Sequence, residues 1–177
     1  MAHIDLGNEI PGIRGLFEYR PDTGAVLSDL GEVLLRGEST LPRGERELIA
    51  AYVSHLNGCR YCAGAHGACA GAQLPGGAAQ VEQALNDPEA PVISPKLQAL
   101  LEIAALVRLD GRLVTENEVA AARAEGATDR EIHDAVLIAA AFCMLNRYVD
   151  GLAALTPVDP AYYAATGQRL AEHGYRP

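Results

Sequence analysis

The amino-acid sequence predicts an all-α protein, a single domain built as a bundle of about seven or eight helices. Apolar residues recur at helical spacing along most of the 177-residue chain. Two Thr-x-x-Glu capping boxes, Thr115 with Glu118 and Thr128 with Glu131, stand directly before such patterns. The sequence contains no run of alternating β-branched residues, the pattern that would predict a strand. Hydrophobic residues make up 49% of the chain and aromatic residues 5%, which suits closely packed helices.

Helices can be assigned in order along the chain, with turn residues between them. Residues 1–23 are broken by prolines and glycines, so we expect an irregular N-terminal arm that packs apolar side chains on a neighbour. Residues 157–177 follow a later group of prolines and form a C-terminal extension of the same domain, residues 1–177. The expected helices cover residues 25–36, 43–55, 59–72, 78–85, 95–109, a stretch after 115, 129–148 and 161–172.

The chain is acidic, with a formal net charge of −9 and a pI near 4.9. Since no basic cluster offsets this charge, we expect neither a nucleic acid nor an anionic membrane as a partner. No uninterrupted apolar run reaches the roughly 18–20 residues of a membrane span. The N-terminus lacks a hydrophobic signal core, so we expect a cytoplasmic protein. Thiols stay reduced there, which favours catalytic or metal-binding cysteines over structural disulfides.

The stretch ELIAAYVSHLNGCRYCAGAH, residues 47–66, contains the candidate catalytic residues Glu47, Cys59, Cys62 and His66. The Cys-x-x-Cys pair comes directly after an Asn-Gly break, so we expect it to open a new helix. The start of a helix carries partial positive charge and unsatisfied N–H groups, which favour a thiolate over a thiol. The remaining chain is interpreted as a helical frame that positions this dithiol.

Within one helix, Cys59, Cys62, His66 and Cys69 lie on a common face. Cys62 then has a second thiol one turn before it and a histidine one turn after it. A thiol that reduces peroxides or exchanges disulfides needs a resolving thiol and a group that handles protons. Cys59 and the His66/Glu47 pair can supply these two functions.

A structural zinc site is the main alternative for a Cys-x-x-Cys pair. Ten positions of one helix extend about 15 Å, so four side chains spread over them cannot all reach one ion. We therefore expect neither a metal nor a cofactor. Cys69 and Cys143 are predicted to be small buried hydrophobic residues rather than reactive thiols.

The full pattern is Glu47, eleven residues, Cys59-x-x-Cys62, three residues and His66. It resembles the signature of AhpD-like alkylhydroperoxidases in the carboxymuconolactone decarboxylase superfamily. The strings YVSHLNGCRYC, residues 52–62, and NRYVDGL, residues 146–152, are similar to the peroxidase-related subgroup of that superfamily.

This resemblance implies an AhpD-like helical bundle that assembles into homo-oligomers, as a dimer, trimer or hexamer. It implies that Cys62 attacks a small hydroperoxide, that Cys59 resolves the sulfenic acid, and that His66 and Glu47 relay protons. A dithiol of unknown identity would return the electrons. The best-studied branch has a second histidine just before the distal cysteine, where this chain has Tyr61. A tyrosine does not titrate near pH 7, so proton handling is expected to differ.

Two other functions remain open. A carboxymuconolactone decarboxylase-like activity is one, although such enzymes characteristically lack this dithiol. A redox-sensing or assembly protein that oxidises once, without turnover, is the other. A faint internal similarity between Arg46-Glu47-Leu48-Ile49 and Arg130-Glu131-Ile132 is compatible with a duplicated helix hairpin.

Overall fold

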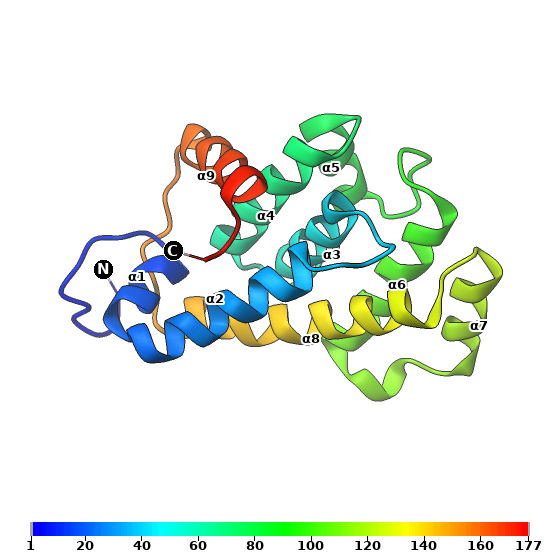
Figure 1. Cartoon of the computed structure of the whole chain (residues 1–177), viewed down its shortest axis with the longest axis horizontal. Coiled ribbons are helices and arrows are strands. Elements are labelled where there is room, and N and C mark those ends of the chain that lie inside the picture. The colour runs from blue at the N-terminus through cyan, green and yellow to red at the C-terminus, as the bar shows by residue number, and fades with distance from the viewer. Residues whose placement is uncertain (1, 177) are drawn as a thin grey trace.

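The computed structural model describes residues 2–176, and every regular element in that range is helical (Figure 1). The all-α prediction is therefore confirmed, with one more helix than expected. The described α-helices are α1 (Ile13–Tyr19), α2 (Pro21–Arg36), α3 (Arg43–Leu56), α4 (Arg60–Gln73), α5 (Gly77–Asn86), α6 (Pro95–Leu109), α7 (Glu116–Ala124), α8 (Asp129–Gly151) and α9 (Pro160–His173), and a 3₁₀ turn, η1, covers Gly111–Leu113.

The irregular arm expected over residues 1–23 needs correction, because this stretch contains α1 and the first turn of α2. Pro21 is the first residue of α2, a position where its missing N–H costs nothing. Gly24 lies inside α2, and a Cβ there would come within 2.8 Å of Phe17 in α1. The proline and glycine therefore start a helix and allow close helix packing, and they do not break the chain.

The main core lies between α3, α6 and α8. Leu48, Ile49 and Val53 of α3 meet Leu100 of α6 and Ile138 of α8, and all five side chains are fully buried. The two capping boxes of the sequence are present at the starts of α7 and α8. At the start of α6, the Ser94 side chain likewise accepts a hydrogen bond from the first turn.

Helix α8 is long and apolar enough to cross a membrane if length and composition alone are considered. A core helix passes the same test. Buried residues occur along α8 from Glu131 to Val149, and the helix packs against α3 and α6. Its apolar character thus matches its place in the core of the bundle.

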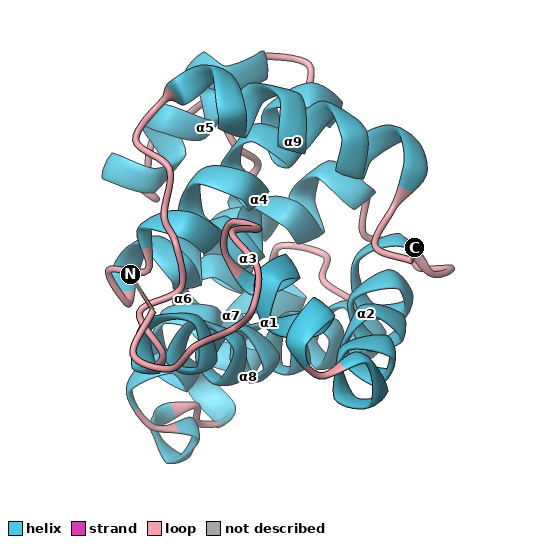
Figure 2. Cartoon of the chain, turned by 90° about the vertical axis from the view of Figure 1, so that its left-hand side faces the viewer, coloured by secondary structure: helices cyan, strands magenta, loops and turns pink. Residues whose placement is uncertain are grey.

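Helix α4 has an unusually close neighbour in α9, and α3 and α5 also pack against it (Figure 2). A Cβ added at Gly167 of α9 would lie 2.5 Å from the backbone of Ala68 in α4. The small residues of α4 therefore allow close backbone approach. A second cluster of buried residues joins Leu16 of α1 and Val149 of α8 to the cysteine-bearing start of α4. The dithiol is thus held on several sides.

Candidate active site

The dithiol lies at the beginning of α4, as predicted. A turn through Gly58, with φ of 74°, separates α3 from α4, and Cys59 is the N-cap residue in an extended conformation. The backbone N–H of Cys59 donates to the Ser54 carbonyl at 3.0 Å. Cys62 follows in the first turn of the helix, on the same face as Cys59. Both cysteines are reduced and buried.

The protonation state of Cys62 differs from the expectation of a resting thiolate. A hydrogen bond with Cys59 raises the pKa of Cys62 well above its ordinary value, and burial raises it further. The partial positive charge at the start of α4 does not offset these two effects. Cys62 is therefore a neutral thiol at neutral pH in this conformation, and its reaction as a nucleophile requires a base.

Asn146 of α8 is a contact of Cys62 whose role the sequence did not reveal. A hydrogen bond from its side chain favours the thiolate and so opposes the rise in the pKa of Cys62. The Asn146 amide also donates to the Ser54 hydroxyl at 3.0 Å and accepts from Asn57 at 2.8 Å. Ser54 in turn donates to the Ala50 carbonyl. This buried network fixes the amide beside the sulfur.

Glu47 and His66 come together from adjacent helices. The Glu47 carboxylate of α3 lies 2.8 Å from Nδ1 of His66 in α4, so the expected contact between them is present. Glu47 is only 1% exposed, and the His66 ring packs edge-on against Phe142 with ring centroids 4.5 Å apart. Both hydrogen bonds of the ring to described residues involve Nδ1, which leaves Nε2 available to act as a base.

Tyr175, which follows α9, is a second residue that the sequence did not reveal. Its hydroxyl donates to the second carboxylate oxygen of Glu47 and lies 3.3 Å from Nδ1 of His66. The Tyr175 and His66 rings are stacked, with centroids 5.9 Å apart and an angle of 12° between planes. The only sequence signal is a lone tyrosine beyond the last helix, between a glycine and an arginine.

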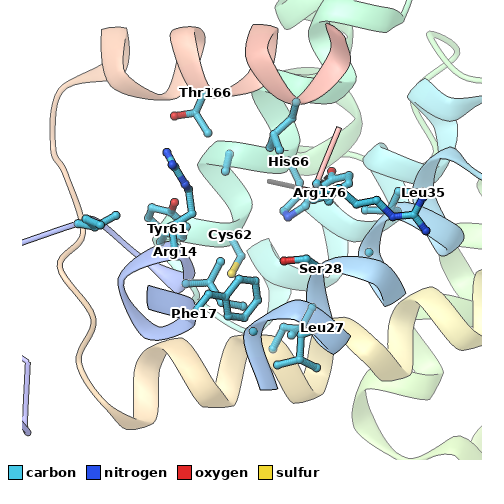
Figure 3. Close-up of a pocket in the computed structure, with 18 of the residues that line it drawn as sticks. Arg14, Phe17, Leu27, Ser28, Leu35, Tyr61, Cys62, His66, Thr166 and Arg176 are labelled. Carbon is cyan, nitrogen blue, oxygen red and sulfur yellow. Dashed lines mark hydrogen bonds between the residues drawn. The ribbon is translucent and has the colours of Figure 1, made fainter. Parts of the chain in front are cut away.

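Cys62 and His66 share a cavity of about 470 Å³ that also reaches Tyr175 (Figure 3). Helices α1 and α2 supply much of its apolar wall, and Phe142 and Leu170 add to it from α8 and α9. Glu47 and Cys59 are not among the lining residues, so they stand behind the residues that face the cavity. The cavity can therefore present an apolar molecule to the Cys62 sulfur.

Tyr61 occupies the position of the histidine found in the best-studied branch of the family. Burial raises the pKa of Tyr61, and a hydrogen bond with Tyr162 at 3.4 Å adds to this effect. The ring also sits where a Cβ on Gly12 would lie, 2.0 Å from its carbon atoms. Tyr61 thus forms part of the cavity wall and keeps its proton at neutral pH.

The other two cysteines differ in their surroundings. Cys69 is fully buried, and burial together with the nearby Glu47 raises the pKa of its thiol. Cys143 is partly buried, with its sulfur 3.6 Å from the Asn57 amide. Within residues 2–176, no three His, Cys, Asp or Glu side chains converge as a metal site would require.

Comparison with known proteins supports the resemblance that the sequence motifs indicated. The family model of the carboxymuconolactone decarboxylase family matches residues 21–72, which span α2, α3 and α4 and include all four candidate residues. Among curated proteins, none is similar enough to count as a match.

Two solved structures share the fold. An uncharacterized peroxidase-related protein from Silicibacter sp. is 28% identical with a TM-score of 0.78, over 89% of this chain and 81% of its own. An uncharacterized peroxidase-related protein from Ralstonia eutropha, with an alkylhydroperoxidase AhpD core, is 26% identical with a TM-score of 0.78. That match covers 90% of this chain and 82% of the other. These comparisons support the predicted resemblance to the AhpD-like and carboxymuconolactone decarboxylase superfamily, and to its peroxidase-related proteins.

Proposed function

We propose that this protein is a thiol-dependent reductase of organic hydroperoxides, in which Cys62 attacks the peroxide and Cys59 resolves the product. One observation carries the proposal: Cys62 and His66 face the same largely apolar cavity, while Cys59 contacts Cys62 from behind. The reactive sulfur, the base and the resolving thiol thus all lie at the N-cap or in the first half of α4. The apolar wall favours a hydroperoxide with a hydrocarbon body over hydrogen peroxide.

In the first step, Nε2 of His66 takes the proton of the Cys62 thiol, directly or through one water molecule. The thiolate attacks the distal oxygen of the hydroperoxide, and the O–O bond breaks. The alkoxide leaves as an alcohol after it receives the proton from His66, and Cys62 becomes a sulfenic acid. Glu47 holds Nδ1 of His66 and stabilises the imidazolium that forms between the two proton transfers.

In the second step, the Cys59 sulfur attacks the sulfenic sulfur, the S–O bond breaks, and water leaves with the Cys59 proton. The product is a Cys59–Cys62 disulfide. An external dithiol then reduces this disulfide by two thiol–disulfide exchanges and is itself oxidised. One turnover converts a hydroperoxide and a dithiol into an alcohol, water and a disulfide.

The subunits are proposed to form a homo-oligomer that works in the reducing cytoplasm, where such a dithiol is available. A decarboxylase activity is not favoured, because nothing in that reaction requires the paired thiols.

Stopped-flow oxidation of the reduced protein by cumene hydroperoxide tests the proposal. The wild-type protein is expected to react at least a hundredfold faster than free cysteine, since a positioned base alone contributes roughly 10²–10⁴. Cys62→Ser should abolish the reaction. Cys59→Ser should keep the first oxidation and accumulate a sulfenic acid that dimedone traps, and Cys143→Ser serves as the matched control.

Steady-state consumption of cumene hydroperoxide with dithiothreitol distinguishes a catalyst from a sensor. A catalyst consumes many equivalents of peroxide, whereas a sensor stops after one. A wild-type rate equal to that of free cysteine would refute the proposal.

A further inference from the structure

The segment after α9, residues 174–176, crosses α2 and is tied to it at several points. We call it the strap. The Tyr175 backbone N–H donates to the Glu32 carboxylate at 2.9 Å, and Arg176 donates to Asp29 at 2.7 Å. The chain turns into the strap through Gly174, with φ of 82°, where a Cβ would lie 2.3 Å from the same Glu32 carboxylate. The strap therefore has a defined path that fixes where Tyr175 points.

The Tyr175 side chain reaches from the strap into the candidate active site. Its hydroxyl donates to Glu47, and its ring is stacked on His66, so it touches both members of the proton-handling pair. Burial and the negative charge of Glu47 raise the pKa of Tyr175, so its hydroxyl keeps the proton that it donates.

The tautomer of His66 depends on which group in this trio holds each proton. With Glu47 ionised, Nδ1 of His66 carries a proton and donates it to one carboxylate oxygen, and Nε2 has a free lone pair. If Glu47 were protonated, it would donate to Nδ1, and the ring proton would move to Nε2. In that second state Nε2 cannot accept a proton from Cys62.

Other charged and titratable groups around Glu47 and His66 do not replace this donor. From α4, the Cys69 thiol contacts Glu47, but a thiol is a weak donor. From α2, the Arg36 guanidinium donates to Glu32 and to the carbonyls of Leu170 and Ala171. From α8, Phe142 contributes only an apolar ring edge. Tyr175 therefore supplies the strong neutral donor to the second carboxylate oxygen.

We infer that Tyr175 is a positioning residue: through its hydrogen bond to Glu47 it keeps His66 in the tautomer whose Nε2 is unprotonated. The chemical role of that tautomer rests on the proposed function, whereas the presence of the tautomer can be tested without it. The strap after α9 thus completes the site, although it lies more than a hundred residues from the dithiol along the chain.

Nitrogen-15 NMR of the imidazole ring, recorded against pH, tests this directly and requires no peroxide. In the wild type, His66 is expected to show the Nδ1-protonated neutral form. In Tyr175→Phe the stacked ring remains but the donor is lost, so the ratio of the two neutral tautomers should shift roughly tenfold towards Nε2–H. A hydrogen bond to a charged group has about this effect.

The matched control is Tyr163→Phe, which removes a hydroxyl bonded at 2.7 Å to the Pro157 carbonyl outside the cavity. It should leave the His66 tautomer unchanged. If Tyr175→Phe does not fold, Glu32→Ala loosens the strap without touching His66 and should shift the ratio in the same direction.

A wild-type ring already in the Nε2–H form, or a tautomer ratio in Tyr175→Phe within twofold of wild type, overturns the inference. The second outcome would mean that the stacked ring of Tyr175, and not its hydroxyl, determines the tautomer of His66. A protein that shows the expected tautomers but consumes no peroxide would refute the proposed function and leave the inference standing.

Discussion

Replacing Asn146 by alanine is expected to lower both the stability of the fold and the reactivity of Cys62. The substitution removes the amide that bonds Ser54 and Asn57 and that favours the Cys62 thiolate. Ser54 is fully buried, so water cannot replace the lost partner there. An unsatisfied buried polar group costs about 1–3 kcal/mol.

The loss of these contacts should change the melting temperature and the rate at which Cys62 is alkylated. A loss of about 2 kcal/mol lowers the melting temperature of a domain of this size by roughly 4–8 °C. The thiolate of Cys62 also loses a charge-assisted hydrogen bond, worth about 1.5 kcal/mol, so the pKa of this thiol rises further. At a fixed pH below that pKa, the thiolate fraction and the rate of alkylation should therefore fall roughly tenfold.

Iodoacetamide labelling over a range of pH values, read by peptide mass spectrometry, separates Cys62 from the other cysteines. Asn86→Ala is the matched control, because the Asn86 amide makes one exposed hydrogen bond to the Glu82 carbonyl. If Asn146→Ala melts at the wild-type temperature and Cys62 labels at the wild-type rate at each pH, the role assigned to Asn146 is wrong.

Two further predictions concern the cavity and Glu131, the buried acid of α8. Ser28 lines the cavity, so Ser28→Trp should slow the reaction of Cys62 with cumene hydroperoxide at least tenfold more than its reaction with hydrogen peroxide, as measured by stopped-flow oxidation. Equal slowing of the two reactions would contradict substrate selection by the cavity. Burial raises the pKa of Glu131, but hydrogen bonds from the Thr128 amide and Lys96 outweigh it, so the net pKa lies below 4.5. The stabilisation of the fold by ionised Glu131 is complete above pH 4.5 and is lost as pH falls through the lowered pKa. The urea midpoint of Glu131→Gln should therefore change less between about pH 5 and pH 3 than the midpoint of the wild type.

Local signals explain why much of the fold could be predicted. Helix starts at Ser94, Thr115 and Thr128 follow from side chains that bond the first turn, and this chemistry is confined to a few neighbouring residues. The pairing of Glu47 with His66 was expected from the family resemblance, and the contact is present because a short turn brings α3 and α4 side by side.

The features that were missed depend on how side chains pack in three dimensions. Gly24 permits Phe17 of α1 to approach the backbone of α2, a contact that the sequence did not predict. Tyr175 reaches Glu47 across a sequence separation of 128 residues, which no periodicity records. The raised pKa of Cys62 likewise arises from burial and from the bond to Cys59, and both depend on packing.

The position of Cys59 as the N-cap of α4 has a consequence for how oxidation would affect the protein. A bond from Cys59 to Cys62 would close a ring of only four residues. By chain entropy such a ring restricts the unfolded state by about 2 kcal/mol, against roughly 4.7 kcal/mol for a loop of a hundred residues. The oxidised form should therefore be more stable by about 2 kcal/mol, which raises its urea midpoint by roughly 1 M. The proposed two-electron oxidation of this pair would therefore leave the rest of the bundle folded.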